Sequence, residues 1–396
     1  LEMCFSNMEG GMEISLNKIK EDDIIKILFA ENPGIVIQVK DKHKEEVKKI
    51  LEDAGIGYVK LGKPTEERHI LVEKGDATYQ FGIDYLRDVW YSTSYLLDRK
   101  QSMNGCAKKR FENYKKQPLE FVFDKSFTGK LSQFGLNPDR RTPTGIKAAI
   151  IREKGTNGER EMAYMLYLAG FDVKDVTMTD LVSGRETLED INFIVFCGGF
   201  SNSDVLGSAK GWAGAFLFNP KAKAALDNFY ARKDTLSLGV CNGCQLMIEL
   251  NLINPDFTKK AKMLHNDSHK FESKFVGVTV PMNRSVMFGS LSGSKLGIWV
   301  AHGEGKFSLP YHEDKYNVVL KYSYDEYPGN PNGSDYSVAG LASPDGRHLA
   351  MMPHLERSCF PWQNAYYPAD RIKNDQITPW MEAFVNARKW IEMNKK

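Results

Sequence analysis

Residues 1 to about 80 combine short apolar runs with one amphipathic helix. We predict strands at four places: 35–39, 58–61, 69–72 and 78–81. The segment 42–54 is predicted to be a helix, because its apolar residues recur at helical spacing and Gly55 follows as a stop. The apolar face of this helix consists of Val47, Ile50, Leu51 and Ala54. Such a mixture is typical of an α+β domain.

A second helical pattern is followed by a basic stretch. The apolar stripe, which is typical of a packing face, consists of Leu86, Val89, Trp90, Thr93 and Leu97. From Arg99 to Arg141 the chain is rich in Lys and Arg and is interrupted by prolines. We interpret 96–144 as a connector, and a charged linker exposed to solvent is favoured there over a ligand site.

From residue 147 onward, strands and helices alternate. A continuous apolar run predicts a buried strand at 148–151, and further strands are predicted at 173–176, 191–197 and 236–240. Helices are predicted at 161–169 and from the end of the last strand to residue 250. This alternation implies a parallel sheet with right-handed crossovers, which binds ligands at the carboxyl ends of its strands. We therefore predict an α/β fold with an open, mostly parallel sheet flanked by helices, preceded by a partial α+β domain and a linker.

Composition and charge narrow the class of protein. The chain has 396 residues, of which 42% are hydrophobic and 26% charged, as in soluble globular proteins of two or three domains. The net charge of +2 argues against a dedicated nucleic-acid binder, and no apolar run reaches the length of a membrane helix. The six cysteines are scattered, which favours the reducing cytoplasm. The sequence contains no nucleotide-binding loop of the form G-x-x-x-x-G-K-[ST].

The strongest chemical signal is the segment 238–245, with the sequence LGVCNGCQ. Cys241 lies between a strand and a helix, and Gly239 and Gly243 leave room for the sharp turn of a nucleophile elbow. The start of the following helix favours the reactive thiolate. Three alternatives stay open: a redox dithiol of Cys241 and Cys244, half of a zinc site, or a packed structural cysteine.

A second signal is the pair His354 and Glu356, which follows the apolar run 349–352. In an extended segment, residues i and i+2 point to the same side, and Leu355 would point away. A histidine oriented by a carboxylate, next to a cysteine, follows the logic of a catalytic triad. Alone the pair is a weak signal, but together with the cysteine elbow it predicts nucleophilic catalysis.

Two glycine-containing segments complete the candidate site. Gly198 and Gly199 follow a predicted strand, and their backbone amides could hold an oxyanion together with the amide of Asn242. An ordinary tight turn is the alternative for this segment. His302 lies in the sequence AHGEG after a strand-like run, and we consider it a candidate substrate contact or part of a polar glycine-rich loop.

These motifs together resemble the class I (triad) glutamine amidotransferases, whose fold is flavodoxin-like. Further segments are similar to the C-terminal glutaminase domain of the large, single-chain phosphoribosylformylglycinamidine synthase family: 197–207, 211–212, 301–305, 330–334 and 352–357. Segments 1–5 and 32–39 look like the end of the second synthase half of that family. The resemblance implies a synthase remnant similar to aminoimidazole ribonucleotide synthetase over 1–95, the connector over 96–144, and the glutaminase domain over 145–396.

The resemblance also implies a role for each candidate residue. Cys241 matches the nucleophile, His354 the general base and Glu356 the carboxylate that orients the base. Gln245 matches a residue that contacts the substrate glutamine. The family usually has Pro where Leu355 stands, and we expect activity to survive this difference, which should cost only about 0.4–1 kcal/mol. The positions that match the oxyanion hole are Gly198, Gly199 and Asn242.

The function implied by the resemblance is hydrolysis of glutamine. The ammonia would convert formylglycinamide ribonucleotide to formylglycinamidine ribonucleotide in an ATP-dependent step of purine biosynthesis. We expect no cofactor or metal in this chain, and ATP and Mg in a longer enzyme whose synthase part lies upstream and is the partner. Neither nucleic acid nor a membrane is expected as a partner. The alternatives are a docking module that is catalytically silent alone, and another cysteine hydrolase on the same fold.

Overall fold

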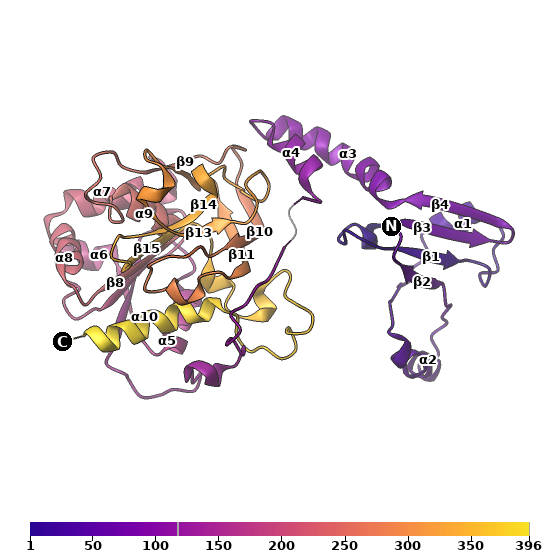
Figure 1. Cartoon of the computed structure of the whole chain (residues 1–396), viewed down its shortest axis with the longest axis horizontal. Helices are drawn as coiled ribbons and strands as arrows, with labels where there is room; N and C mark the ends of the chain where they lie inside the picture. Colours follow the sequence, from indigo (N-terminus) through magenta and orange to yellow (C-terminus); the bar gives the residue numbers. More distant parts are fainter. Residues whose placement is uncertain (117–118, 396) are drawn as a thin grey trace. The chain divides into compact units, whose positions relative to one another are not determined.

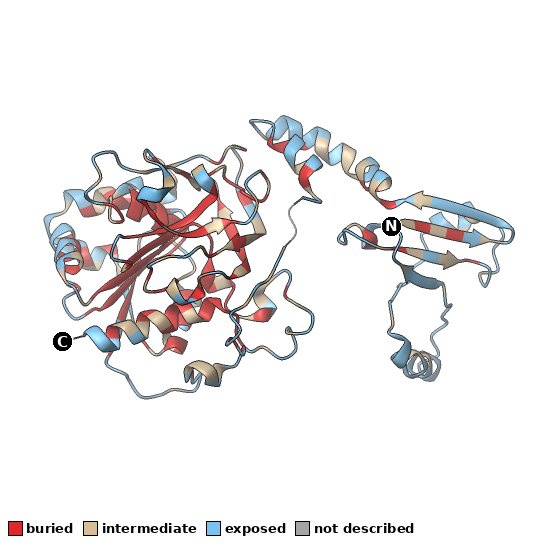
Figure 2. Cartoon of the chain, in the orientation of Figure 1, coloured by how far each residue is buried: buried red, intermediate tan, exposed pale blue. Residues whose placement is uncertain are grey.

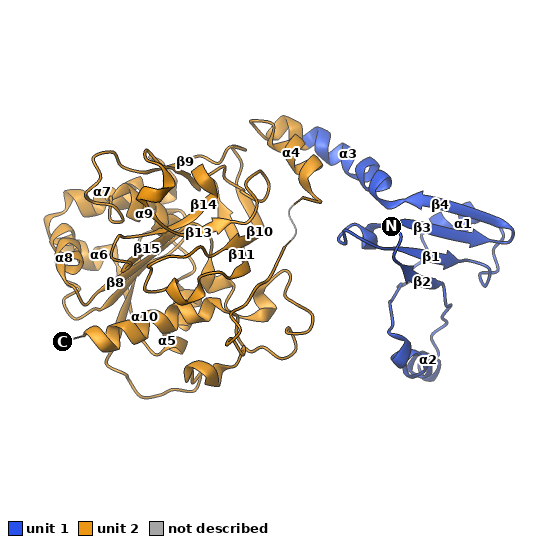
Figure 3. Ribbon diagram, viewed as in Figure 1, with its two compact units in different colours: residues 1–97 blue, residues 98–396 orange. Residues whose placement is uncertain are grey.

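The computed structural model describes residues 1–116 and 119–395. The chain divides into two compact units, Leu1–Leu97 and Asp98–Lys396 (Figure 3). Among the described residues, every helix falls short of the length and apolar character that a bilayer crossing needs.

The first unit contains a four-stranded sheet with the strand order β2-β1-β3-β4. Strand β1 is parallel to β3 and antiparallel to β2, and β3 is antiparallel to β4. The strands are β1 Gly11–Ser15, β2 Gly62–Thr65, β3 His69–Lys74 and β4 Ala77–Gly82. The helices are α1 Ile24–Phe29, α2 Lys44–Asp53 and α3 Ile83–Gln101, whose end belongs to the second unit. The small core consists of Cys4, Leu16, Ile70, Val72 and Ile83.

Two of the four strands predicted in this unit are confirmed, as β3 and β4. The strand predicted at 35–39 is wrong: these residues form no strand, and Ile35 is 90% exposed. The strand predicted at 58–61 is also wrong, because pairing with β1 begins only at Gly62. Helix α2 is confirmed, but no residue of its apolar face is buried. Apolar periodicity predicts a face that can be buried, and burial also requires a neighbouring element to cover that face.

The second unit is built on a nine-stranded sheet with the order β11-β10-β13-β14-β15-β8-β7-β5-β6. The five strands from β15 to β6 are mutually parallel. The other four continue the sheet beyond β15, and each of them is antiparallel to the strand next to it. The parallel strands are β5 Lys147–Arg152, β6 Asp172–Thr177, β7 Phe193–Phe196, β8 Leu236–Val240 and β15 His348–Met351. The antiparallel strands are β10 Glu272–Thr279, β11 Lys295–His302, β13 Asn317–Tyr322 and β14 Val338–Ala342. A separate pair is formed by β9 Lys262–Leu264 and β12 Lys306–Ser308.

Helices cover both faces of this sheet, which confirms the predicted open α/β architecture. Helix α5 packs against α10, whereas α6, α7, α8 and α9 form a second group, on the other face in Figure 1. The strands between them are buried (Figure 2). The helices are α4 Cys106–Asn113, α5 Glu159–Ala169, α6 Met178–Ser183, α7 Lys210–Phe218, α8 Pro220–Ala231, α9 Asn242–Glu249 and α10 Trp380–Asn394.

Within 96–144, which is predicted to be a charged linker exposed to solvent, the side chain of Arg110 is only 24% exposed. Arg110 in α4 forms ion pairs with the buried carboxylates of Asp98 and Glu272, the first residue of β10. Lys270 also pairs with Asp98, at 2.9 Å. Burial tends to raise the pKa of Asp98, but hydrogen bonds from Ser102 and Lys270 and the charge of Arg110 lower it. The positive charge of Arg110, which the sequence assigns to an exposed linker, is thus paired with two buried carboxylates, and one of them lies on the sheet.

Candidate active site

Cys241 lies in the sharp turn between strand β8 and helix α9. Its backbone has φ 52° and ψ −108°, a strained conformation that non-glycine residues rarely adopt. A Cβ on Gly239 would lie 2.5 Å from the Gly243 carbonyl oxygen, and a Cβ on Gly243 would lie 2.0 Å from the Phe196 carbonyl oxygen. Both flanking positions therefore accept only glycine, and the predicted elbow geometry is present.

Hydrogen bonds tie the Cys241 turn to two neighbouring segments. The backbone amide of Cys241 donates to the Met351 carbonyl at the end of β15, with a distance of 2.9 Å. The sulfur of Cys241 donates to the carbonyl of Ala301 in β11, with a distance of 3.3 Å. Only 5% of Cys241 is exposed. The thiol is therefore held at the carboxyl end of β8, where ligands bind in open α/β sheets.

His354 and Glu356 meet at the same edge of the sheet. Strand β15 is parallel to β8, with Met351 paired to Val240, so the chain leaves the sheet beside the Cys241 turn. His354 Nδ1 lies 2.6 Å from Glu356 Oε1, and both side chains are only 2% exposed. The structure therefore brings this predicted pair together with Cys241.

The prediction that His354 and Glu356 meet through an extended segment is wrong. The segment is not extended, because a 3₁₀ turn begins directly after His354 and covers Leu355–Arg357. The two side chains meet through this bend and not through the alternation of a strand. Leu355 is fully buried at the first position of the turn. The first position of a helical turn tolerates Pro, so the usual family residue would fit this backbone.

His354 has a strongly perturbed pKa. Burial alone would lower the pKa of this imidazole, but the Glu356 carboxylate and the Cys241 side chain outweigh burial and raise it to about 10. The opposite ring nitrogen, Nε2, makes no conventional hydrogen bond to a described residue. A Cβ on Gly198 would lie 2.8 Å from His354 Cε1 and 3.4 Å from Cys241 Cβ. The imidazole and the cysteine therefore border the same small space above Gly198.

The loop that contains Gly198 and Gly199 is fixed from the other side by residues 155–157. The Asn157 amide donates to the Gly198 carbonyl, and the Phe200 amide donates to the Gly155 carbonyl, both at 2.9 Å. Gly199 has φ +125°, and a Cβ there would lie 2.6 Å from Thr156 Cα. The loop is a built part of the site, and its role as an oxyanion hole stays a prediction.

Asn242 and Gln245 support the loops around Cys241. Asn242 Oδ1 accepts from the Ser201 amide at 3.0 Å, and Asn242 Nδ2 donates to Gln245 Oε1 at 2.9 Å. Gln245 Nε2 donates to the Glu304 carbonyl at 2.8 Å. Both side chains are thus engaged with the protein itself. The predicted contact of Gln245 with glutamine stays a prediction, and the structure adds a positioning role that its sequence position did not indicate.

His302 is a second buried histidine in this region. It ends strand β11, directly after Ala301, and neither of its ring nitrogens has a hydrogen-bond partner among the described residues. Burial lowers the pKa of His302 to about 3, and the nearby His354 acts in the same direction. The imidazole is therefore neutral near pH 7 and keeps a donor and an acceptor available. Its role as a substrate contact stays a prediction.

The alternatives for Cys241 receive little support from the structure. Cys244 is completely buried, and burial raises the pKa of its thiol well above the ordinary value, which disfavours redox chemistry. All six cysteines are free. Within the described part of the chain, no group of three or more His, Cys, Asp or Glu side chains could hold a metal ion. The strained backbone of Cys241 favours the elbow over a merely packed cysteine.

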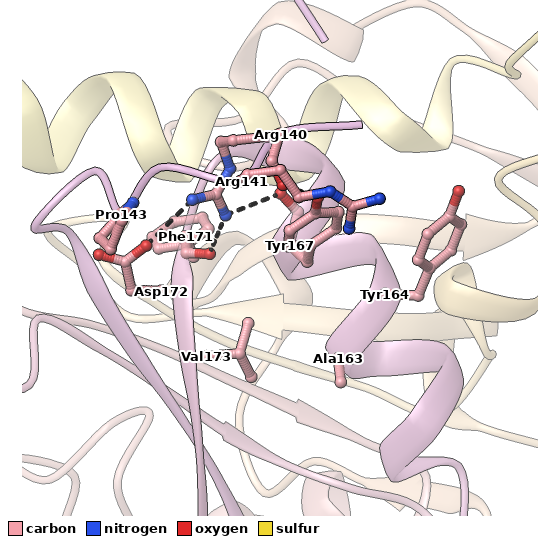
Figure 4. Close-up of a pocket in the computed structure, with 9 residues that line it drawn as sticks. All are labelled: Arg140, Arg141, Pro143, Ala163, Tyr164, Tyr167, Phe171, Asp172 and Val173. Carbon is pink, nitrogen blue, oxygen red and sulfur yellow. Dashed lines mark hydrogen bonds and ion pairs between the residues drawn. The ribbon is translucent and has the colours of Figure 1, made fainter. Parts of the chain in front are cut away.

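Another cavity, of about 500 Å³, lies beside helix α5 and the first residues of strand β6 (Figure 4). Arg140 closes one side by donating to the carbonyl of Phe171 at 2.7 Å and to Asp172 Oδ1 at 3.1 Å. Arg141 points toward Tyr164 instead (Figure 4). Asp172 begins β6, whereas Cys241 follows the last residue of a parallel strand. The cavity therefore lies at the opposite end of the strands from the candidate active site.

Comparison with known proteins shows the family to which this chain belongs. Residues 145–391 match the CobB/CobQ-like glutamine amidotransferase domain, and the chain belongs to this family. The human phosphoribosylformylglycinamidine synthase is 38% identical over 425 residues, which cover 98% of this chain and 31% of that protein. The probable phosphoribosylformylglycinamidine synthase, chloroplastic/mitochondrial, of Arabidopsis thaliana is 36% identical over 420 residues, which cover 99% of this chain and 29% of that protein.

A solved structure to which this chain is similar is titled the structure of PurLQS from Thermotoga maritima. It has 27% sequence identity and a TM-score of 0.48, and the match covers 63% of this chain and 99% of that one. The chain spans 29–32% of the length of the curated relatives named phosphoribosylformylglycinamidine synthase.

Proposed function

We propose that this chain supplies the glutaminase activity of a phosphoribosylformylglycinamidine synthase. Cys241 is the nucleophile, His354 the general acid and base, and Glu356 the carboxylate that orients His354. The observation that carries the proposal is the buried His354–Glu356 pair, 2.6 Å apart, which borders the same space as the strained Cys241. Nucleophile, base and orienting group in this order form the usual arrangement for acyl transfer through a covalent intermediate.

In the first half of the reaction, the Cys241 thiolate attacks the side-chain carbonyl carbon of glutamine and forms a carbon–sulfur bond. Protonated His354 donates its proton to the amide nitrogen, the carbon–nitrogen bond breaks, and ammonia leaves a glutamyl thioester. The pKa of about 10 for His354 supports a protonated imidazole in the resting site near pH 7. Glu356 keeps its negative charge and holds Nδ1 of the ring in place.

In the second half, water hydrolyses the thioester. His354 takes a proton from the water as its oxygen attacks the carbonyl carbon, the carbon–sulfur bond breaks, and glutamate and the Cys241 thiolate result. In both halves we assign the oxyanion to the backbone amides of Gly199 and Asn242. Asn242 begins helix α9, where backbone N–H groups lack partners within the helix, which supports this assignment.

The ammonia acceptor belongs to the larger protein of which this chain is proposed to be the C-terminal part. The names of the relatives support formylglycinamide ribonucleotide as the acceptor. ATP and Mg²⁺ would serve the acceptor step, and we assign none of the described residues to them. The synthase part of the same polypeptide is the proposed partner. Six free, buried cysteines support a reducing compartment, for which we propose the cytoplasm.

Replacement of Cys241 tests the proposal. In the intact protein, Cys241→Ala should reduce glutamine hydrolysis about 10⁴–10⁶-fold, as expected for loss of a nucleophile that acts in a unit with its base. A glutamine analogue with an alkylating group at the amide position should label Cys241 in the wild type. The control variant Cys244→Ala should retain both labelling and hydrolysis.

The same experiment separates the alternatives. Labelling at Cys244, or glutamine hydrolysis that survives in Cys241→Ala, would remove Cys241 from the role of nucleophile. Activity of the intact protein together with a silent isolated chain would identify this chain as a module that needs its partner. Labelling by general thiol reagents at Cys241, without reaction with glutamine, would favour another cysteine hydrolase on the same fold.

A further inference from the structure

The cavity of about 500 Å³ beside helix α5 is a possible ligand site of its own. Its volume lies within the range of about 300–1,000 Å³ that is typical of sites for small molecules. Its lining comes from three segments, 140–143, 163–167 and 171–173, next to the edge strand β6 (Figure 4). None of the lining residues is assigned a role in glutamine hydrolysis, and the Cys241 turn lies at the other end of the parallel strands.

Hydrogen bonds fix one wall of this cavity. Asp172 accepts from the Arg140 guanidinium at 3.1 Å and from the backbone amides of Thr144 and Gly145 at 3.0 Å and 2.7 Å. The same guanidinium lies over the ring of Tyr167, 4.7 Å from its centroid. The opposite charges of Arg140 and Asp172 therefore compensate each other, and both groups hold the wall in shape.

Arg141 carries the charge of the lining that is left without a partner. Its side chain is exposed and points toward Tyr164 (Figure 4). Its guanidinium makes no hydrogen bond or ion pair with any residue that the structure describes. Because the uncompensated charge is positive, the cavity favours an anion. A planar guanidinium binds two oxygens of a phosphate or carboxylate side by side.

A row of aromatic rings extends from the cavity over the surface. Tyr164 is 43% exposed, and its ring stacks near that of Tyr167, with 6.4 Å between the centroids. Tyr164 also lies 6.2 Å from Phe360, whose ring is parallel to that of Trp362 within 8°. Trp362 is 78% exposed. Exposed apolar groups that gather in this way mark a binding surface, and flat rings stack on such side chains.

We propose that this cavity binds a nucleoside monophosphate, with the base stacked on Tyr164 and the phosphate paired with Arg141. The base supplies a flat ring for the tyrosine, and the phosphate supplies the paired oxygens that the guanidinium binds. A nucleic acid is disfavoured, because its backbone needs several unpaired cations along its path and the described lining leaves only Arg141 unpaired. The site is independent of the proposed glutamine hydrolysis.

Photolabelling of the intact protein by an azide-bearing derivative of adenosine monophosphate tests this site. Peptide mapping separates it from any other nucleotide site, because the label should enter a peptide that contains α5. Unlabelled adenosine monophosphate should compete. Arg141→Gln should weaken this competition about 10–100-fold, because a hydrogen bond to a charged group is lost. Tyr164→Leu should weaken it about 5–50-fold through the loss of stacking. Both side chains are exposed, so both variants should fold.

Arg284→Gln is the matched control, because this exposed arginine lies outside the cavity lining. It should leave labelling and competition unchanged. Adenosine and inorganic phosphate should each compete about 10-fold less well than adenosine monophosphate, since each makes only one of the two contacts.

Three results would overturn the proposal. They are a label absent from the α5 peptide, labelling that neither Arg141→Gln nor Tyr164→Leu weakens, and competition by benzoate or by single-stranded RNA that equals competition by adenosine monophosphate. Glutamine hydrolysis by the same preparation reports separately on Cys241. A protein that hydrolyses glutamine but fails the labelling test would therefore contradict the nucleotide site and leave the proposed function standing.

Discussion

Two histidines at the candidate site are equally buried and yet differ in charge. His354 at the end of β15 and His302 at the end of β11 are each 2% exposed. The pKa of His354 is raised to about 10, whereas that of His302 is lowered to about 3. Burial lowers the pKa in both cases, and only His354 has a carboxylate, Glu356, within hydrogen-bond distance. The partner of a buried imidazole, and not its burial, thus decides its charge.

The difference also separates the possible roles of the two residues. A histidine that holds a proton near pH 7 next to a cysteine can donate it to a leaving group. A histidine that stays neutral can only donate and accept hydrogen bonds without changing its charge. We therefore expect substitutions of the two residues, and of the groups around them, to have effects of very different size.

Removal of the His354 side chain should have the largest effect. In His354→Gln, glutamine hydrolysis by the intact protein should fall about 10⁴–10⁶-fold, because the nucleophile loses its proton donor and acceptor. Steady-state release of glutamate measures the effect. His312→Gln, at an exposed histidine, is the control. If His354→Gln kept more than a tenth of the wild-type activity, the assignment of His354 as acid and base would be wrong.

Removal of the Glu356 charge should make His354 resemble His302. In Glu356→Gln the pKa of His354 should fall, because burial is then opposed by the Cys241 side chain alone. Activity near pH 7 should drop about 10³–10⁴-fold. NMR titration of the His354 ring measures the pKa, and Glu313→Gln at the surface is the control. A pKa that stays near 10 would show that Glu356 does not set the charge.

Glu356→Gln should also change how the stability of the fold depends on pH. The raised pKa of His354 stabilises the fold fully below pH 6.5, and this contribution is lost as pH rises through about 10. In Glu356→Gln the loss of stability between pH 6.5 and 10 should become smaller. Thermal unfolding at several pH values measures it.

The substitution Gly198→Ala tests the position of the His354 ring. In Gly198→Ala the new Cβ would lie 2.8 Å from His354 Cε1, so the ring must shift. A displacement of a catalytic group by about 1 Å can cost about 10²-fold in rate, and we expect a decrease of that order in kcat. Gly214→Ala on helix α7 is the matched control, because its Cβ would meet only the Phe218 ring, at 3.8 Å. Equal activity of the two variants would contradict the described position of the ring.

Substitution of His302 should have the smallest effect, and this effect should be on the stability of the fold at acid pH. In the unfolded chain, His302 binds a proton below about pH 6.5. In the folded protein it does so only near pH 3, because burial lowers its pKa. The fold therefore loses stability as pH falls from about 6.5 to about 3. In His302→Leu the difference in Tm between pH 7 and pH 4 should shrink, by about 2–4 °C for each kcal/mol regained. The control is His312→Leu. An unchanged difference would mean that His302 is protonated in the fold.

Much of the second unit could be predicted from short-range patterns. Apolar runs identified β5, β7 and β8, because parallel strands covered on both faces contain few polar positions, whereas β6 at the edge of the sheet contains polar residues. The spacing of Gly239, Cys241 and Gly243 predicted the sharp turn. The antiparallel half of the sheet was not predicted as a sheet, because strand direction depends on which segments pair. The strand at 35–39 failed for the same reason, because a strand needs a partner.

The sequence by itself determined the local elements and the reactive types of side chain, because helical and strand periods and glycine spacing act over a few residues. It left two matters to the tertiary structure: the bend that joins His354 to Glu356, and the difference in charge between His354, which is protonated near pH 7, and His302, which is neutral. Each of these depends on groups that are distant in the sequence or on burial within the folded protein. Electrostatic free energies are decided by such contacts, and these form only when the sheet is assembled.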